Sequence, residues 1–346
     1  MKKVGICGVY GNDVEILGGQ TIKVKELTEE LIHIFGTEEV TTVNTYKWRK
    51  NPLDLFIKCC NMIKDCENII IMPAHNGLKV FSPMFFFLNI LFKRKIHYIV
   101  IGGWLYDYLC KYKLVKLCLH KFSGIYVETK SMKKSLESLG FNNVHIMNNF
   151  KRLKLMNKTE LTTTYVEPYK LCMFSRVTQG KGIEDAINSI VNINTKMGRT
   201  VFNLDIYGPI DNRYKDRFEE IIKISPQHIK YCGFEDSQKS VDVIKNYFVQ
   251  LFPTRYKTEG IPGSIIDSYF AGVPVLASRW NNFNDVIDEN KTGIGFEFLS
   301  QEDLEDKLIY IANNPKTIID MKINCIDKSL IYAPDYVRKE FIEHLK

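Results

Sequence analysis

The stretch TEGIPGSIIDSYFAGVPVLAS, Thr258 to Ser278, reads as a loop, a helix and a strand in close succession. The apolar run VQLFPT just before it is typical of a buried parallel strand, and Gly272 is placed to end the helix. Glu259 then lies on the loop at the carboxyl end of a strand, and Gly263 and Ser264 lie at a helix N-terminus. The free N–H groups of such a terminus attract anions. The stretch therefore predicts an α/β fold with an anion-binding turn.

Two carboxylates flank this turn, because Asp267 lies eight positions after Glu259 and one turn inside the helix. Its side chain can reach back toward the same crevice. Carboxylates accept hydrogen bonds from hydroxyl groups, while the N–H groups of the turn suit a phosphate. The turn therefore predicts a sugar-nucleotide site. The alternative is structural: Glu259 is a solvated loop acid and Asp267 a charge near a helix N-terminus.

A second motif lies upstream, in LCMFSRVTQGKGIEDAINSI. Leu171 to Val177 reads as a strand that runs into a loop with Arg176 and Lys181, and Gly182 then admits a helix. Two fixed cations on such a loop suit a diphosphate, because they stabilise the negative charge that grows as a sugar leaves. Alone, a lysine before a helix is usually a solvated surface charge. Together with the Glu259 turn, the motif is specific.

The two motifs resemble the donor site of glycosyltransferase family 4, in which two glutamates at this spacing flank a similar turn. Here the second acid is Asp267, which is shorter. The resemblance implies that Glu259 contacts hydroxyls of the transferred sugar and that Asp267 holds the nucleotide ribose. It also implies that Arg176 and Lys181 bind the donor diphosphate and are catalytic residues together with Glu259.

The resemblance also outlines the rest of the donor site. Where the family often has Phe-Gly after Glu-Gly, this chain has Ile261 and Pro262, and proline offers no N–H. The backbone donors are therefore expected just after the proline. The expected donor-binding residues are Gly18, Gly19, Gly208, Phe234, Gly260, Gly263, Ser264 and Asp267.

The first half opens with an apolar strand, KKVGICGVYG, and a loop that reaches Gly18 and Gly19 before a helix. In family terms this Gly-Gly turn meets the donor diphosphate or the acceptor, and the alternative is a simple tight turn. A dinucleotide-binding turn would need Gly-x-Gly-x-x-Gly directly after the strand. Cys7 stands where the second glycine is needed, so a dehydrogenase is a poor fit.

His75, in MPAHNG, follows a predicted buried strand and either approaches the acceptor or sugar or is a loop histidine satisfied by backbone. Many family members carry a histidine after the next strand. In this chain IHYIVIGGW has Gly102, Gly103 and Trp104 there. His75 and these three residues are the candidate acceptor or sugar contacts. The backbone amides of the two glycines are expected to replace the missing histidine.

The length of 346 residues and the hydrophobic content of 45% fit two α/β domains. The resemblance implies the GT-B fold, two Rossmann-like domains whose parallel sheets face a central cleft. The expected parts are an acceptor-binding domain at 1–150, a linker at 151–170, a donor-binding domain at 171–330, and a C-terminal helix at 331–346 that packs back on the first domain.

The net charge of +7 lies entirely in residues 1–150, which hold 20 Lys or Arg and 13 Asp or Glu. Within this half, the apolar run VFSPMFFFLNILF and the aromatic-basic run WLYDYLCKYKLVKLCLHKF lie close together. The apolar run is too short to span a bilayer. It forms either a buried helix or part of a basic amphipathic face for anionic lipid. No nucleic-acid recognition motif accompanies the charge, so no nucleic-acid partner is expected.

The nine cysteines show neither metal-binding spacing nor a disulfide framework, and the chain has no Asp-x-Asp motif. No metal and no cofactor are therefore expected. The opening residues follow a strand pattern rather than that of a signal segment, which predicts a cytoplasmic protein, peripheral on the inner face of the plasma membrane if lipid is bound.

The expected activity is that of a metal-independent, retaining glycosyltransferase of polysaccharide synthesis. The donor is a UDP- or GDP-sugar, and the acceptor is a saccharide or a polyprenyl-diphosphate-linked saccharide. Two alternatives stay open: a nucleotide-sugar epimerase or hydrolase of the same fold, and a non-catalytic sugar-nucleotide-binding protein at a membrane surface.

Overall fold

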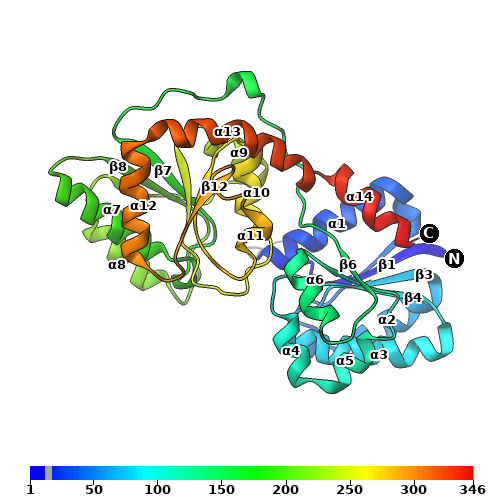
Figure 1. The fold of residues 1–346 in the computed structure, drawn as a ribbon. Coiled ribbons are helices and arrows are strands. Elements are labelled where there is room, and N and C mark those ends of the chain that lie inside the picture. The colour runs from blue at the N-terminus through cyan, green and yellow to red at the C-terminus, as the bar shows by residue number, and fades with distance from the viewer. Residues whose placement is uncertain (12–17, 346) are drawn as a thin grey trace. The chain divides into compact units, whose positions relative to one another are not determined.

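The computed structural model describes residues 1–11 and 18–345, which form two compact units (Figure 1). The first unit contains Met1–Arg152 and Pro334–Lys346, and the second contains Leu153–Ala333. Most of the loop predicted before Gly18 lies outside the described residues. Each unit is built on its own six-stranded parallel sheet.

The first sheet has the strand order β2-β1-β3-β4-β5-β6. Its strands are β1 (Lys2–Gly8), β2 (Val40–Asn44), β3 (Cys66–Ile71), β4 (Lys95–Ile99), β5 (Gly124–Val127) and β6 (Val144–Ile146). Its helices are α1 (Gly19–Phe35), α2 (Pro52–Asp65), α3 (His75–Phe92), α4 (Leu105–Lys111), α5 (Lys113–Leu119), α6 (Lys130–Glu137) and α14 (Pro334–Ile342). Figure 1 shows α2, α3, α4 and α5 on the side of the sheet opposite to α1 and α14.

The second sheet has the strand order β12-β11-β10-β7-β8-β9. Its strands are β7 (Tyr169–Phe174), β8 (Phe202–Tyr207), β9 (Ile229–Gly233), β10 (Val249–Phe252), β11 (Val275–Ser278) and β12 (Gly293–Phe296). The helices are α7 (Ile183–Met197), α8 (Lys215–Ile224), α9 (Ser240–Ile244), α10 (Gly263–Phe270), α11 (Phe283–Val286), α12 (Gln301–Asn313) and α13 (Pro315–Ser329).

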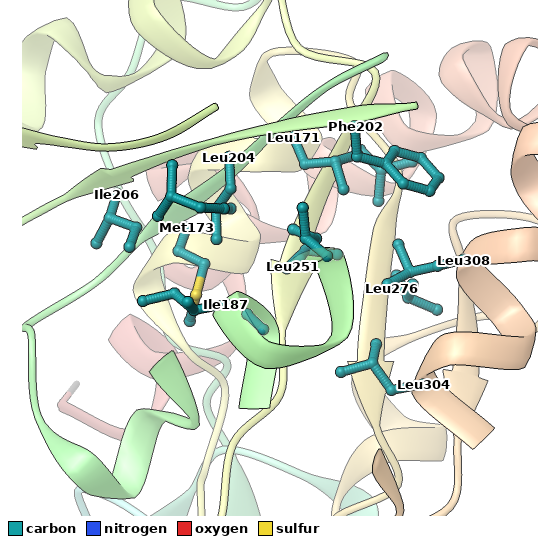
Figure 2. Close-up of a cluster of buried hydrophobic side chains, with 14 of the residues drawn as sticks. Leu171, Met173, Ile187, Phe202, Leu204, Ile206, Leu251, Leu276, Leu304 and Leu308 are labelled. Atoms are coloured by element: carbon teal, nitrogen blue, oxygen red, sulfur yellow. The ribbon is translucent and has the colours of Figure 1, made fainter. Parts of the chain in front are cut away.

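The central strands are largely apolar and buried because helices cover both faces of a parallel sheet. All residues of β10 and β11 are buried, as the predicted run VQLF requires. Figure 2 shows how neighbouring strands supply one side of this core, with Leu204, Leu251 and Leu276 directed toward Ile187 of α7 and Leu308 of α12. This packing fixes the strand ends from which the functional loops leave.

The C-terminal segment belongs to the core of the first unit. Phe341 and Leu345 are 2% and 3% exposed, and the Phe341 ring meets the edge of the Tyr126 ring at 4.8 Å. The side-chain amide of Asn68 donates to the carbonyl of Leu345 at 3.0 Å. Phe341 and Leu345 are therefore held to the first sheet by packing against β5 and by a buried hydrogen bond from β3.

The segment 153–168 has no regular structure apart from a short 3-10 turn, Lys158–Glu160. It nevertheless packs along the second unit. The Met156 N–H donates to the carbonyl of Phe270 at 3.0 Å, and the Tyr165 hydroxyl donates to the carbonyl of Tyr247 at 3.2 Å. None of the helices that the structure describes is long and apolar enough to cross a membrane.

Candidate functional site

The second unit brings Lys181 and Glu259 together, and the Lys181 ammonium donates to Oε1 of Glu259. Lys181 ends a 3-10 turn shortly after β7, and Glu259 lies on the loop after β10. The two strands are neighbours, with Leu171 paired to Val249, so their carboxyl ends lie at one edge of the sheet. The two side chains are only 19% and 16% exposed. Such an edge is where open α/β sheets bind their ligands.

The loops after β7 and β10 touch through glycines. Gly182 has φ +71°, and a Cβ there would lie 1.9 Å from the carbonyl oxygen of Pro253. A Cβ on Gly180 would lie 2.2 Å from the ring of Tyr256. Only glycine allows both approaches. They place the Lys181 ammonium 5.6 Å from the centre of the Tyr256 ring, and an aromatic face stabilises a cation at this distance.

Three polar residues fix the loop that carries Glu259. The Thr254 hydroxyl lies 3.2 Å from Oε1 of Glu259 and donates to it, and the Asn282 side-chain amide donates to the Glu259 carbonyl at 2.6 Å. The Ser278 hydroxyl donates to the carbonyl of Thr254 at 2.7 Å. Sequence reasoning missed the roles of Thr254, Ser278 and Asn282, because single polar residues in loops or at a strand end carry no motif.

A second connection joins this loop to α7. Both guanidinium contacts of Arg255 go to Asp185, at 2.7 and 2.6 Å, and the Arg255 N–H donates to the carbonyl of Gly180 at 2.9 Å. A bidentate pair fixes direction as well as distance. The loop with Glu259 is therefore held to the turn with Lys181 by main chain and side chain. No sequence signal identified Asp185 or Arg255 for this role.

Arg176 lies on the same loop as Lys181 and is 40% exposed. One of its guanidinium nitrogens is 3.9 Å from Asp211, whose carboxylate also binds Arg213 at 3.1 Å. Predicted Gly208 lies beside it: its φ is +134°, and a Cβ there would lie 1.9 Å from the carbonyl oxygen of Ser175. This close approach explains the glycine at position 208 without any ligand. The contact between Arg176 and Asp211 is long for an ion pair, so the guanidinium can turn toward a ligand.

The predicted anion-binding turn forms the start of α10, whose N-cap is Pro262. Gly263 and Ser264 are partly exposed there, and their N–H groups precede the first intrahelical bonds. Gly260 is buried in the approach to the helix. Asp267 is only 1% exposed, so its carboxylate lies inside the unit rather than at its surface.

Phe234 follows β9 and is 69% exposed, so its ring faces solvent beyond the end of the sheet. The role in donor binding that the sequence assigned to it stays a prediction. Within the described residues, no group of three or more His, Cys, Asp or Glu side chains is arranged to hold a metal ion. The expectation of a metal-independent site also stays a prediction.

In the first unit, the predicted acceptor contacts meet at the carboxyl ends of β3 and β4. The rings of His75 and Trp104 stack, with centroids 3.8 Å apart and an angle of 26° between the planes. The Tyr108 hydroxyl donates to the His75 carbonyl, and the Trp104 indole N–H donates to the carbonyl of Ile101 at 2.7 Å. Partial burial lowers the pKa of His75, which favours a neutral ring at pH 7. Flat, anchored rings of this kind suit the apolar face of a sugar.

The remaining predicted glycines of the first unit lie on turns. Gly102 has φ +80° three residues after the end of β4, next to Gly103, so the turn that presents Trp104 depends on a left-handed backbone conformation. Gly18 is the N-cap of α1, and Gly19 is its first residue. A Cβ on Gly19 would meet nothing within 4 Å. The close approach expected at Gly19 is therefore not made to any described residue of this chain.

Comparison with protein families gives a match within the second unit. Residues 158–327, just under half of the chain, match the family described as Glycosyl transferases group 1. The matched segment contains Arg176, Lys181, Glu259 and Asp267. A curated relative, the uncharacterized glycosyltransferase MJ1069 of Methanocaldococcus jannaschii, is 22% identical over 149 residues. These residues are 42% of this chain and 36% of the relative, so the similarity spans about a third of the relative's length.

Solved structures are similar over the whole chain. Alr3699/HepE of Anabaena, in complex with UDP, is 11% identical with a TM-score of 0.76 and covers 100% of this chain and 99% of its own. Sucrose-phosphate synthase (tll1590) of Thermosynechococcus elongatus is 14% identical with a TM-score of 0.77, covering 99% and 98%. A glycosyltransferase of Rickettsia africae is 15% identical with a TM-score of 0.73, covering 100% and 98%. The predicted α/β GT-B fold is confirmed.

Proposed function

We propose that this chain, which carries a group 1 glycosyltransferase domain in its second unit, is a retaining glycosyltransferase of family 4 that takes its sugar from a nucleotide diphosphate. One observation supports the activity above the others. Lys181 and Glu259 meet at the carboxyl edge of the sheet, inside the segment that matches the family. A cation for the diphosphate and a carboxylate for the sugar are then adjacent, as a single donor molecule requires.

The proposed reaction is a transfer with front-face departure. The acceptor hydroxyl oxygen forms a bond to the anomeric carbon while the bond from that carbon to the β-phosphate oxygen breaks. The electron pair goes to the leaving diphosphate, which takes the proton of the acceptor hydroxyl. Arg176 and Lys181 stabilise the charge that develops on the diphosphate, and positioned cations are effective in this role. Metal independence is part of the proposal and rests on these two side chains.

The proposed donor is a UDP-sugar, and a GDP-sugar is the second candidate. The neighbour Alr3699/HepE was solved with UDP and also with UDP and glucose, which favours uridine for a chain of the same fold. Glu259 is assigned to hydroxyls of the transferred sugar and Asp267 to the ribose. The N–H groups of Gly263 and Ser264 are assigned to phosphate oxygens.

The acceptor is proposed to be a saccharide, presented on a polyprenyl diphosphate during synthesis of a capsule, O-antigen or other cell-surface polysaccharide. The enzyme then works in the cytoplasm at the inner face of the plasma membrane. The stacked rings of His75 and Trp104 are assigned to this acceptor, because aromatic faces bind the C–H groups of sugar rings. The positive charge of the first unit supports a membrane-side acceptor.

An assay of free nucleotide diphosphate, with and without a saccharide acceptor, tests the activity. A transferase releases the diphosphate faster when acceptor is added, and the sugar appears on the acceptor. A hydrolase releases it equally fast without acceptor, an epimerase changes the sugar without release, and a non-catalytic binding protein does neither. Thermal-shift measurements with UDP-, GDP- and ADP-sugars identify the donor for this assay, because a bound donor raises the melting temperature.

A further inference from the structure

The long apolar helix α3 is only half buried. Leu78, Phe81 and Phe85 face the sheet and are at most 2% exposed. The opposite side of the helix carries a second apolar stripe at helical spacing, made of Val80, Phe87, Ile90 and Leu91, which are 39%, 57%, 60% and 78% exposed. The sequence predicts that the apolar run in α3 forms either a buried helix or part of an amphipathic face. Because α3 presents apolar side chains to both the core and the solvent, we favour the second role.

Two neighbouring helices continue this surface. The elements α2 and α5 pack against α3 on the same side of the first sheet (Figure 1). Each carries large apolar side chains with more than two fifths of their area exposed: Leu53, Phe56 and Ile57 on α2, and Leu114 and Leu117 on α5. We call the exposed apolar residues of these three helices the docking face. Apolar side chains that stay exposed in such number on packed helices mark an interaction site.

Positive charge borders the α3 and α5 part of the docking face, whereas α2 carries two lysines and two aspartates. Residues 75–121 hold eight Lys or Arg and one acid, Asp107. Three of the cations, Lys93, Arg94 and Lys95, directly follow Phe92, the last residue of α3. In the described part of the chain, no carboxylate forms an ion pair with any of Lys79, Lys93, Arg94, Lys95, Lys111, Lys113, Lys116 and Lys121.

The nearest interactions of these cations are with neutral groups. The Arg94 guanidinium donates to the carbonyls of Ile63 and Lys64, and the Lys79 ammonium lies 3.8 Å from the centre of the Tyr112 ring. Their charge is therefore available to an external anion.

We propose that the docking face binds the surface of a bilayer that contains anionic lipid. The apolar side chains enter the boundary between head groups and acyl chains, and the cations bind the lipid phosphates. Lysine stems extend over apolar surface while their charges stay in water, so both contacts form together. The charge favours a bilayer over a second copy of this chain as the occupant, because two docking faces would bring like charges together.

This inference deepens the proposed function, because a lipid-linked acceptor needs an enzyme at the bilayer. It rests on the proposed function only for that acceptor, since the docking face is defined by exposure and charge alone. The proposed lipid site and the proposed nucleotide site lie in different units of the chain, so binding to lipid and binding to nucleotide can be measured separately.

The test is co-sedimentation of the full chain with vesicles of phosphatidylcholine, or of phosphatidylcholine with phosphatidylglycerol, at low and high salt. One variant carries Leu91→Ser and Lys93→Glu on the docking face. Its matched control carries Ile224→Ser and Lys223→Glu, an exposed apolar and basic pair on α8 of the second unit. Native protein and control are expected to bind the anionic vesicles in a salt-sensitive way, and the docking-face variant at least about tenfold more weakly.

Three outcomes overturn the proposal: native protein that stays in the supernatant at low salt, equal binding by the docking-face variant, and a native dimer without vesicle binding that Leu91→Ser dissociates. The last outcome makes the face a protein interface. Calorimetry with UDP on the same samples separates the two proposals. Vesicle binding without nucleotide binding keeps the docking face and removes the transferase, and the reverse result keeps the donor site alone.

Discussion

The ammonium of Lys181 binds the carboxylate of Glu259, which lies 78 positions later in the chain. The two charges neutralise each other at the edge of the second sheet, where both side chains are shielded from solvent. In the proposed donor complex, the diphosphate competes for the ammonium, and the carboxylate accepts hydrogen bonds from sugar hydroxyls. Under this proposal, donor binding exchanges one internal ion pair for two contacts with the ligand.

The first prediction concerns Lys181. Replacement by alanine removes a positioned cation from the developing diphosphate charge, so turnover at saturating donor is expected to fall by about 10²-fold or more. Steady-state release of nucleotide diphosphate measures this fall. Lys215→Ala, at an exposed lysine on α8, is the control and should leave turnover unchanged.

Lys181→Ala also removes the cation that pairs with Glu259. Protein stability must therefore be measured together with activity. An unpaired, mostly shielded carboxylate destabilises the fold. Lys181→Arg keeps the charge and should retain the melting temperature while turnover still falls, because a guanidinium has a different shape. Unchanged turnover in Lys181→Ala at saturating donor would contradict the assignment.

The sequence predicted the individual pieces of the donor site because each lies in one continuous motif. The strand-loop-helix pattern around Lys181 and the turn at Glu259 are both readable from local apolar runs and glycines. The contact between Lys181 and Glu259 cannot be predicted from local patterns. It depends on β10 pairing with β7, and such pairing between strands far apart in the chain has no local signature.

Residues whose role comes only from tertiary contact could not be predicted. Thr254 and Asn282 hold Glu259 through single hydrogen bonds, which any polar loop residue of suitable position can make. The two faces of α3 could not be predicted either, since a run that is apolar on most sides does not tell which side chains the sheet will cover. Gly208 was assigned to the donor, and the structure adds a reason within the chain, its close approach to Ser175.

The second prediction separates the two carboxylates of the turn. Glu259→Gln should weaken transfer with little effect on binding of the free nucleotide diphosphate, because Glu259 is assigned to the sugar. Asp267→Asn should weaken nucleotide binding, since a charge-assisted hydrogen bond contributes roughly 1.5–3 kcal/mol. Calorimetry with UDP or GDP alone measures the difference. Equal losses of nucleotide affinity in both variants would contradict the assignment of Glu259 to the sugar and Asp267 to the ribose.

The third prediction concerns Asp185, which binds Arg255 through both carboxylate oxygens. Asp185→Asn should release the loop that carries Glu259 and lower kcat by roughly tenfold, because catalysis depends on positioning to within a fraction of an ångström. Nucleotide binding and the melting temperature should change little, since the pair is partly exposed.

The adjacent residue gives a matched control for Asp185. Glu184 is also on α7 and binds Arg217 at 2.8 Å with similar exposure, but Arg217 belongs to α8 and not to the Glu259 loop. Arg217→Ala should therefore leave kcat unchanged. If it lowers kcat as much as Asp185→Asn does, loss of any surface ion pair on α7 explains the result, and positioning of Glu259 does not.

The last prediction concerns pH and the first unit. His97, in β4, is 1% exposed and lies between the Tyr126 hydroxyl at 3.1 Å and Oδ1 of Asn68 at 3.2 Å. One ring nitrogen accepts from the tyrosine while the other donates to Asn68, so the neutral ring satisfies both. Burial, followed by the nearby charges of His344, Lys95 and His145, lowers the pKa of His97 to about 3.

The sign of the effect follows from this lowered pKa. The unfolded chain takes up the proton near pH 6.5 and the folded chain only near pH 3, so the stability that His97 contributes is complete above pH 6.5 and is lost as the pH falls. At pH 5 the loss amounts to about 2 kcal/mol. Hydrogen exchange of peptides from β3 and β4 at pH 7.5 and pH 5, corrected for intrinsic rates, measures it. His97→Gln should reduce this pH dependence, whereas His33→Gln, at an exposed histidine of the same unit, should preserve it. Equal pH dependence in native protein and His97→Gln would show that other groups control the acid sensitivity of this sheet.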